Sequence, residues 1–494
     1  MIKKSIMVLG IQIRDIYNEY YKVSEDEQKE YNKRVEIRGW VLNFRNQNNN
    51  IFIGLVDGSY DKNLQIVIHK DKIENIEDIE NIRGATIKIE GNIVKSPAKG
   101  QDIEIVGEKI EIEGIIRDKK SVLLAKTVDL ETLRNNQHLR TRFRSYNYIY
   151  KIRNSLIKNV HEYFQNNNFY NLDPNVITTS DCEGAGEVFT ITSMDFNKLY
   201  NEIKEDKIKE QEIFKNDFFE KQAYLTVSSQ LQLEALCAGL SRVYTLNPSF
   251  RAEKSKTKRH LGCFTHLEWE IAFIDINDLM NFSEDMVKSV IKKTLEENKT
   301  VYEELNKYIS VGIIEKLENV INNKFERITY TFAIELIEEH KKNILKKYKK
   351  EITIKDIPKW GDDLGSYCEK YICDEIYKKP VLIYNYPKVL KSFYMKLNDD
   401  NNTVQACDLI FPNLGELIGS SIREDNYEKL INIMEERNMD KSKLQWYIDL
   451  RYNSTFKHGG AGLGFDRLTN FCCLMDGNIR DVVPFPVAFT ECNY

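Results

Sequence analysis

A short segment near the middle of the 494-residue chain gathers side chains that suit a phosphate-bearing ligand. The side chains stand on two strand-like segments joined by a polar loop, and they are Arg251, Glu253, Arg259, His260 and Phe264. If the two segments form an antiparallel hairpin, all five side chains crowd one end of it. Arginine makes two-point bonds to oxyanions, and an aromatic ring suits the face of a base. The segment indicates a nucleotide site, with a surface network of ion pairs as the alternative.

Two carboxylates in apolar, strand-like surroundings form a second candidate site. Asp408 and Glu416 stand in the run that ends at Arg423. A buried carboxylate is costly unless it is paired or binds a metal. Magnesium prefers hard oxygen ligands and shares them with phosphates. The run therefore predicts either a magnesium site or a pair of salt bridges.

A glycine-rich stretch, His458-Gly-Gly-Ala-Gly-Leu-Gly-Phe-Asp-Arg-Leu468, forms the third candidate. Its glycines allow a ligand to approach the backbone closely, and we expect a helix to begin near Asp466. The stretch fits neither the dinucleotide fingerprint nor the P-loop. Alone, it is weak evidence for a nucleotide site.

Alternation of apolar residues indicates a small β-domain ahead of these sites. Between about Val35 and Glu113, apolar residues recur at every second position in short runs, as in half-buried strands. Turn-forming residues at 46–50, 57–59 and 97–100 separate the runs. About five short strands predict a closed barrel of the OB type, with any other small β-domain as the alternative.

The remaining elements must position the candidate sites. A charged stretch follows the barrel, and then helical spacing predicts a helix from about Tyr148 to Gln165. Beyond Pro174 we expect mixed strands and helices, with strand-like segments at 224–227, 264–274, 404–410 and 416–422. We therefore predict a β-barrel domain in residues 1–116, a hinge in 117–135, and a larger domain in 136–494 that carries a helical insertion around 277–350.

Composition limits the class of protein. Hydrophobic residues make up 42% and charged residues 30% of the chain, as in globular proteins. No apolar run approaches the roughly 20 residues of a membrane helix, and the N-terminus resembles no secretory signal. Nine cysteines without a C-x-x-C pair fit a reducing compartment, so we expect a cytoplasmic protein without membrane contact. The net charge of −5 does not decide about nucleic acid, which needs only a local basic face.

Together and in this order, the segments resemble the three signature motifs of class II aminoacyl-tRNA synthetases. The helix before Pro174 resembles motif 1, residues 251–264 resemble motif 2, and residues 462–467 resemble motif 3. The barrel resembles the anticodon-binding OB domain of the aspartyl, asparaginyl and lysyl subgroup, and the resemblance covers the chain from about residue 10. It implies an α+β multidomain fold, with an N-terminal OB-fold β-barrel and a class II catalytic domain built on an antiparallel β-sheet flanked by helices.

Several strings are similar to the asparaginyl members of this subgroup, namely those at 181–187, 228–234, 360–364, 385–388, 393–395 and 478–482. Aspartyl relatives carry a lysine three residues after the glutamine that matches Gln230, where it pairs with the substrate carboxylate. Here that position is Leu233. Glu268 then matches an acceptor for the amide NH2, and its charge would repel an aspartate side chain. The resemblance implies ATP-dependent activation of asparagine and its transfer to tRNA-Asn.

Matching positions imply a role for each residue of the ATP site. Arg251 would hold the α-phosphate and stabilise the charge that develops there, without a covalent enzyme intermediate. Arg467 would meet the γ-phosphate and one face of adenine, and Phe264 would stack on the other face. Glu253 would help to recognise adenine. His260 or the neighbouring Arg259 would reach the terminal phosphates.

The resemblance also implies a metal site and an amino-acid site. Asp408 and Glu416 would bind Mg²⁺, which bridges phosphate oxygens. Glu183 and Gln230 would hold the α-amino group of asparagine. Arg423 would hold the side-chain carbonyl oxygen, with Ser420 close by.

Three barrel positions match the residues that read the anticodon in this subgroup. Phe52 would stack on a splayed base, whereas Arg45 and Gln65 would bond base edges. Ile51 and Ile53 should face the barrel core, so we expect Phe52 to face outward, with a core position as the alternative. Motif 1 implies a homodimer.

The chain departs from the family pattern at a few positions. Cys263 stands where a glutamate usually precedes the motif 2 phenylalanine, and Val487 stands where a basic residue usually follows Phe-Pro. Cys368 replaces a histidine, and Asp466 replaces the commoner glutamate. Two alternatives stay open: an aspartyl enzyme, including one that charges both tRNAs, and a synthetase-like RNA-binding paralogue that has lost catalysis.

Overall fold

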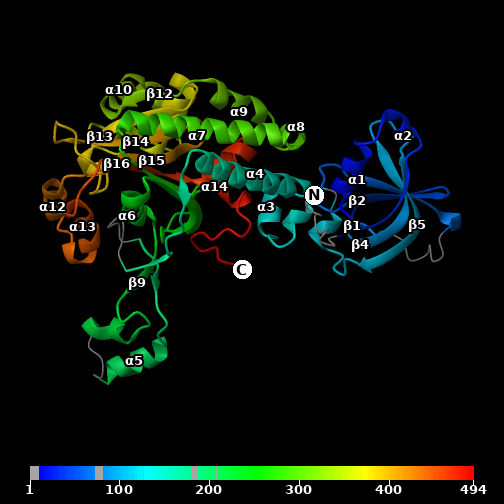
Figure 1. Ribbon diagram of the computed structural model, residues 1–494, viewed down its shortest axis with the longest axis horizontal. Helices are drawn as coiled ribbons and strands as arrows, with labels where there is room; N and C mark the ends of the chain where they lie inside the picture. The colour runs from blue at the N-terminus through cyan, green and yellow to red at the C-terminus, as the bar shows by residue number, and fades with distance from the viewer. Residues whose placement is uncertain (1–9, 73–81, 126, 180–186, 206–209, 494) are drawn as a thin grey trace. The chain divides into compact units, whose positions relative to one another are not determined.

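The structure is a computed structural model that describes residues 10–72, 82–125, 127–179, 187–205 and 210–493. The chain forms two compact units, Met1–Asn147 and Tyr148–Tyr494. Figure 1 shows their elements, which are treated below one unit at a time.

The first unit is built on a closed five-stranded barrel, which confirms the prediction of an OB-type domain. The strand order around the barrel is β1-β2-β3-β5-β4. Neighbouring strands are antiparallel except β3 and β5, which are parallel. The elements of this unit are α1 (Ile13–Tyr20), α2 (Glu25–Lys29), β1 (Asn32–Gln47), β2 (Asn50–Val56), β3 (Leu64–His69), β4 (Thr86–Lys95), β5 (Ile103–Gly114) and α3 (Leu130–Arg134).

Isoleucine and leucine side chains fill the barrel because they alternate with polar residues along each strand. In β4, Ile87, Ile89 and Ile93 are fully or almost fully buried, while the polar residues Lys88, Glu90 and Asn92 between them are partly exposed. Helix α1 adds its apolar side to the same core through Ile13 and Tyr17. The period-two pattern of the sequence thus becomes a barrel interior and an outer face.

The second unit begins within one long helix and contains most of the chain. Its helices are α4 (Arg144–Asn166), α5 (Phe196–Lys204), α6 (Gln230–Leu240), α7 (Ile276–Glu297), α8 (Lys299–Tyr308), α9 (Ile313–Asn322), α10 (Tyr330–Lys347), α11 (Ser366–Tyr371), α12 (Tyr427–Glu436), α13 (Gln445–Tyr452) and α14 (Phe465–Cys473). Its strands are β6 (Tyr170–Asn171), β7 (Ile177–Thr178), β8 (Thr190–Ile191), β9 (Ala223–Leu225), β10 (Arg242–Phe250), β11 (Cys263–Ala272), β12 (Glu326–Thr329), β13 (Val381–Pro387), β14 (Thr403–Phe411), β15 (Gly415–Ile422) and β16 (His458–Gly464).

An eight-stranded sheet in the order β12-β13-β14-β15-β16-β11-β10-β6 forms the centre of this unit. The strands from β13 to β10 are antiparallel, as expected, but the edge strands β12 and β6 pair in parallel with their neighbours. The sheet is therefore mixed at its two edges. The sequence indicated neither edge strand, because both are short and β12 also stands among charged helices.

Helices pack against the sheet (Figure 1). Helix α7 packs across β14, β15 and β16, whereas α6 packs against β10, β11 and β16. The segment predicted as a helical insertion is largely helical, with β12 as the exception. None of the described helices is long and apolar enough to cross a membrane.

Candidate active site

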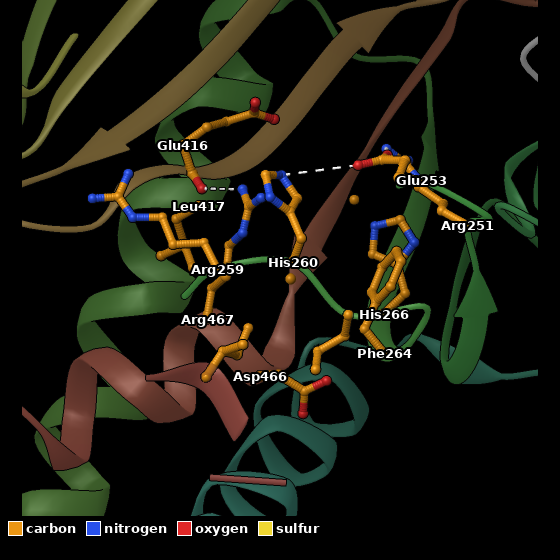
Figure 2. Close-up of a pocket in the computed structure, with 14 residues that line it drawn as sticks. Arg251, Glu253, Arg259, His260, Phe264, His266, Glu416, Leu417, Asp466 and Arg467 are labelled. Atoms are coloured by element: carbon orange, nitrogen blue, oxygen red, sulfur yellow. Dashed lines mark hydrogen bonds and ion pairs between the residues drawn. The ribbon is translucent and has the colours of Figure 1, made fainter. Parts of the chain in front are cut away.

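A cavity of about 160 Å³ lies where β11, β15, β16 and α14 meet (Figure 2). Strand β16 lies between the other two strands. Its Gly462 is therefore opposite Glu268 on β11 and Gly419 on β15. The β10–β11 hairpin supplies the loop that covers one side of the cavity. Three segments that are far apart in the sequence thus form one site.

Seven of the eight residues predicted for ATP line this cavity: Arg251, Glu253, Arg259, His260, Phe264, Glu416 and Arg467. The Glu253 carboxylate lies 3.9 Å from both the Arg251 guanidinium and the His260 imidazole. The Arg251 guanidinium lies 5.7 Å from the centre of the Phe264 ring. Figure 2 shows Arg467 reaching up to the backbone carbonyl of Glu416, to which it donates a hydrogen bond of 2.8 Å.

Three arginines, Arg251, Arg259 and Arg467, line the cavity together with the carboxylates of Glu253, Glu416 and Asp466. Burial lowers the pKa of His260; Glu253 opposes this shift, and Arg467, Arg259 and Arg251 add to it. Burial also lowers the pKa of Arg259, with Arg467 adding to the effect. Such crowding of cations is unfavourable without an anion between them. The electrostatics therefore suit a ligand that brings several phosphate oxygens.

Asp408 does not line the cavity but stands beside Glu416. A side chain added at Gly419 would meet the Glu416 carboxylate at 3.1 Å and the Asp408 carboxylate at 3.8 Å. Asp408 forms an ion pair with Lys391. Burial raises the pKa of Asp408 to about 6, with Glu416 adding to the shift and Lys391 opposing it. Burial also raises the pKa of Glu369 to about 8, to which Glu416 and Asp408 contribute.

This acidic group fits a divalent cation, because a cation would relieve the repulsion among the three carboxylates. The described residues hold no group of three or more His, Cys, Asp or Glu side chains arranged as a metal site. Asp408 and Glu416 would thus supply two oxygen ligands, and the phosphates and water would supply the others. Magnesium is usually bound in this way.

Glu268, the predicted acceptor for an amide, lies on β11 further along the same sheet. Its side chain is buried. It accepts a hydrogen bond from the Ser228 hydroxyl and one of 2.9 Å from the backbone N–H of Ser229. His266 Nδ1 lies 3.5 Å from the same carboxylate. These contacts fix the carboxylate at the start of α6, where a bound amino acid can meet it.

Three of the other predicted amino-acid ligands, Arg423, Ser420 and Gln230, lie within the described residues. Arg423 is buried and uses three of its five N–H donors on Glu270 and Ser421. Ser420 donates to the Cys407 carbonyl at 2.6 Å. Gln230 donates to Glu234 at 3.1 Å. Glu183 lies outside the described residues.

Comparison with known proteins decides the family. Residues 129–488 match the tRNA synthetases of class II (D, K and N), and residues 35–113 match the OB-fold nucleic acid binding domain. The chain belongs to this family of class II tRNA synthetases. The synthetase is 41% identical over 457 residues to an asparagine–tRNA ligase of Borrelia garinii subsp. bavariensis, which covers 92% of this chain and 95% of that protein.

Two further relatives cover nearly the whole synthetase. An asparagine–tRNA ligase of Clostridium tetani is 38% identical over 478 residues, or 96% of this chain and 98% of that protein. The structure of asparaginyl-tRNA synthetase from Pyrococcus horikoshii complexed with asparaginyl-adenylate has a TM-score of 0.79 and 29% identity, and the match covers 98% of this chain and 99% of that one.

The predicted anticodon residues of the synthetase share the outer face of its barrel. Arg45 is exposed and pairs across β1 and β2 with Phe52. Phe52 is half-buried between core residues that point inward, so its ring faces outward as expected. Gln65 pairs with Gly54 on β2, two positions from Phe52, and donates to Glu104 at 3.3 Å. Their contact with tRNA remains a prediction.

Several residues of the site were not predicted from the sequence. His266 lines the cavity two positions after Phe264, on the same face of β11, and the period of two could have indicated it. Glu270 continues that face and pairs with Arg423. Glu369 and Lys391 interact with Asp408 from separate elements, and no local pattern in the sequence indicated them.

Two of the departures from the family pattern contact each other. Cys263 forms an isolated antiparallel bridge with Val487, and the backbone N–H of Gly262 donates to the Val487 carbonyl at 2.8 Å. The two departures are thus joined through the backbone.

Proposed function

We propose that this synthetase activates asparagine with ATP and transfers it to the 3′ end of tRNA-Asn. The observation that carries the proposal is that Glu268 on β11, Gly462 on β16 and Gly419 on β15 lie opposite one another across the sheet. Gly462 lines the cavity and is the cross-strand partner of Glu268, whose carboxylate is buried. Relatives that carry the name asparagine–tRNA ligase support the choice of amino acid. No finding favours the aspartyl or the inactive alternative.

The cavity would hold ATP by its base and its phosphates. Phe264 would stack on adenine, and Arg467 would cover the opposite face and reach the γ-phosphate. Arg251 would bind the α-phosphate, where negative charge builds up as the asparagine carboxylate attacks the phosphorus and pyrophosphate leaves. Because the guanidinium is already in place, it would stabilise this charge without rearrangement. Positioning and electrostatics would account for catalysis, since no covalent intermediate is needed.

Asp408 and Glu416 would hold Mg²⁺, which would supply positive charge to the phosphate oxygens when bound. Lys391 would hold Asp408 in place until then, because the two form an ion pair. Arg259 would neutralise charge on the terminal phosphates, and His260, whose pKa is lowered, would donate a hydrogen bond to them.

Glu268 would select asparagine over aspartate. A carboxylate accepts a hydrogen bond from the amide NH2 but repels a second carboxylate, and a polar site of this kind can discriminate by about 10⁴–10⁵. Leu233 is buried in an apolar cluster with Cys237 and Val243, so no cation at that position would favour aspartate. Arg423 would donate to the side-chain carbonyl, and Gln230 and Glu183 would bind the α-amino group.

The barrel would bind the anticodon through Arg45, Phe52 and Gln65. Stacking and base-edge bonds of this kind read single-stranded loops. We further propose that two copies of the chain associate through the region of α4, which resembles motif 1, and that the enzyme acts in the cytoplasm.

Charging of tRNA tests this function directly. Purified protein is incubated with ATP, Mg²⁺, labelled asparagine and a tRNA-Asn transcript, with a tRNA-Asp transcript in parallel. We expect acid-insoluble label on tRNA-Asn only. Label on tRNA-Asp, or none on either transcript, would contradict the proposal.

A further inference from the structure

A second cavity of about 210 Å³ adjoins the nucleotide cavity and shares Arg259 with it. Four cations line it: Lys258, Arg259, Lys316 and Lys370. They come from the β10–β11 loop, α9 and α11, so no single helix or loop accounts for their convergence. Below, this cavity is called the basic annex.

The basic annex holds little negative charge. Asp476, an exposed residue, is its single lining carboxylate. Within the described part of the chain, none of the four cations has a carboxylate oxygen within 4 Å. Surface lysines and arginines are usually solvated singly, but four around one concavity create a strong positive potential. The charge of the annex suits a polyanion.

Arg259 connects the two cavities. Figure 2 shows its guanidinium turned away from the Phe264 ring, toward the far side of Arg467. A phosphate chain that leaves the nucleotide cavity past Arg467 would meet Arg259 next. The arginine could then bind phosphate oxygens in either cavity.

Lys316 has a structural role that must be separated from ligand binding. It donates to the carbonyls of Phe471 and Leu474 at 2.8 and 2.9 Å and so caps the C-terminus of α14. The cap neutralises the negative end of that helix, which would otherwise repel an anion. The other three cations have no comparable structural contact among those of the described residues.

We propose that the basic annex is a second oligophosphate site, which holds inorganic pyrophosphate after it leaves the nucleotide cavity. This inference rests on the proposed activation of asparagine, because that reaction forms pyrophosphate beside Arg259. The annex would make product release stepwise and would retain pyrophosphate near the site where the reverse reaction uses it.

The test is calorimetric titration of pyrophosphate into protein saturated with a non-hydrolysable ATP analogue. The analogue fills the nucleotide cavity, so any pyrophosphate that still binds must occupy a second site. We expect one pyrophosphate per chain. A Lys258→Ala/Lys370→Ala variant should bind it at least tenfold more weakly, whereas Lys258→Arg/Lys370→Arg should stay within about threefold of the unmodified protein.

A Lys350→Ala/Lys355→Ala variant serves as the matched control, because it removes two exposed lysines elsewhere. It should bind pyrophosphate normally. Absence of pyrophosphate binding to the saturated protein, or equal binding by the two alanine variants, would overturn the annex.

Failure of the annex and failure of the proposed function give different results. Binding of the analogue is measured first, and asparagine-dependent activity is measured separately on each variant. Normal asparagine-dependent activity, without pyrophosphate binding to the analogue-saturated protein, would reject the annex alone. Pyrophosphate bound to a protein that cannot activate asparagine would reject the proposed function and leave the annex as an anion site.

Discussion

The Glu270 carboxylate holds the Arg423 guanidinium by three hydrogen bonds, from Nε to Oε1 at 3.0 Å and to Oε2 at 3.3 Å, and from Nη2 to Oε2 at 2.9 Å. Both side chains are buried, and Gly460 leaves the space for Glu270, since a side chain there would come within 1.9 Å of Oε2. Burial alone would lower the pKa of Arg423, but Glu270 and Glu234 raise it. Arg423 is thus a fixed cation whose direction is set by Glu270.

Glu270→Gln should therefore damage both stability and asparagine binding. A buried pair that loses one charge destabilises a protein by about 3–5 kcal/mol. In asparagine-dependent exchange we expect the KM for asparagine to rise at least tenfold, because Arg423 loses its orientation, while the KM for ATP changes little. Chemical denaturation and initial-rate kinetics measure the two effects.

The control for Glu270→Gln is Glu338→Gln, which removes an exposed partner of Lys341. Surface pairs contribute about 0–1 kcal/mol, so this variant should match the unmodified protein. An unchanged KM for asparagine in Glu270→Gln would show that Arg423 does not depend on Glu270.

Glu268→Gln should weaken selection of asparagine. The variant keeps the shape of the side chain but loses the charge that accepts an amide and repels a carboxylate. A hydrogen bond to a charged group contributes about 1.5–3 kcal/mol, so kcat/KM for asparagine should fall about 10- to 150-fold. The ratio of asparagine to aspartate activity should fall as well, whereas the exposed control Glu303→Gln should keep it. An unaltered ratio of asparagine to aspartate activity would show that Glu268 does not select the substrate.

Phe52→Ala should separate anticodon binding from amino-acid activation. Stacking of a base on an aromatic ring contributes about 1–3 kcal/mol, so the KM for tRNA-Asn in charging should rise about tenfold or more. Exchange without tRNA should not change, because Phe52 lies on the barrel and not in the cavity. Lys109→Ala, an exposed change on β5, is the control. A loss of exchange in Phe52→Ala would contradict the separation.

Lys316 should give the protein a measurable dependence of stability on pH. Burial lowers its pKa from 10.5 to about 8. Between these two values the unfolded chain binds the proton more strongly than the native protein, so the free energy of unfolding contributed by Lys316 rises as the pH increases from 8 to 10.5. Relative to Lys316→Met, the unmodified protein should gain about 3 kcal/mol over this range.

The measurement is denaturant unfolding of both proteins at pH 7.5, 9 and 10.5 in buffer without phosphate. Lys342→Met, at an exposed position of α10, corrects for general effects of removing a lysine. A constant difference between the unmodified protein and Lys316→Met at all three values would show that Lys316 keeps an ordinary pKa.

The sequence allowed prediction of those features that depend on local pattern or motif order. Alternating isoleucines predicted the barrel, and the structure confirms it. The order of the three motifs predicted that Arg251, Phe264 and Arg467 would share a cavity, and they do. The barrel could be predicted because strand period follows from neighbouring residues, whereas the meeting of Arg467 with Arg251 was implied by the resemblance to the family.

Features that depend on distant contacts could not be predicted. Glu270 stands in the buried half of β11, and nothing near it in the sequence shows that Arg423 is its partner. The bridge between Cys263 and Val487 likewise joins two departures that looked unrelated in the sequence. Long-range pairing depends on the arrangement of the whole sheet, which no local period encodes.

ATP–pyrophosphate exchange, with asparagine and aspartate run side by side in the presence of Mg²⁺, tests the central claim most directly. Label passes between pyrophosphate and ATP only when an amino acid is activated. In this account, activation requires the cognate amino acid to reach both Arg251 and Glu268. We predict rapid exchange with asparagine and at least about 10⁴-fold less with aspartate. Comparable exchange with aspartate would contradict the role given to Glu268, and absence of exchange with either amino acid would contradict the proposed function as a whole.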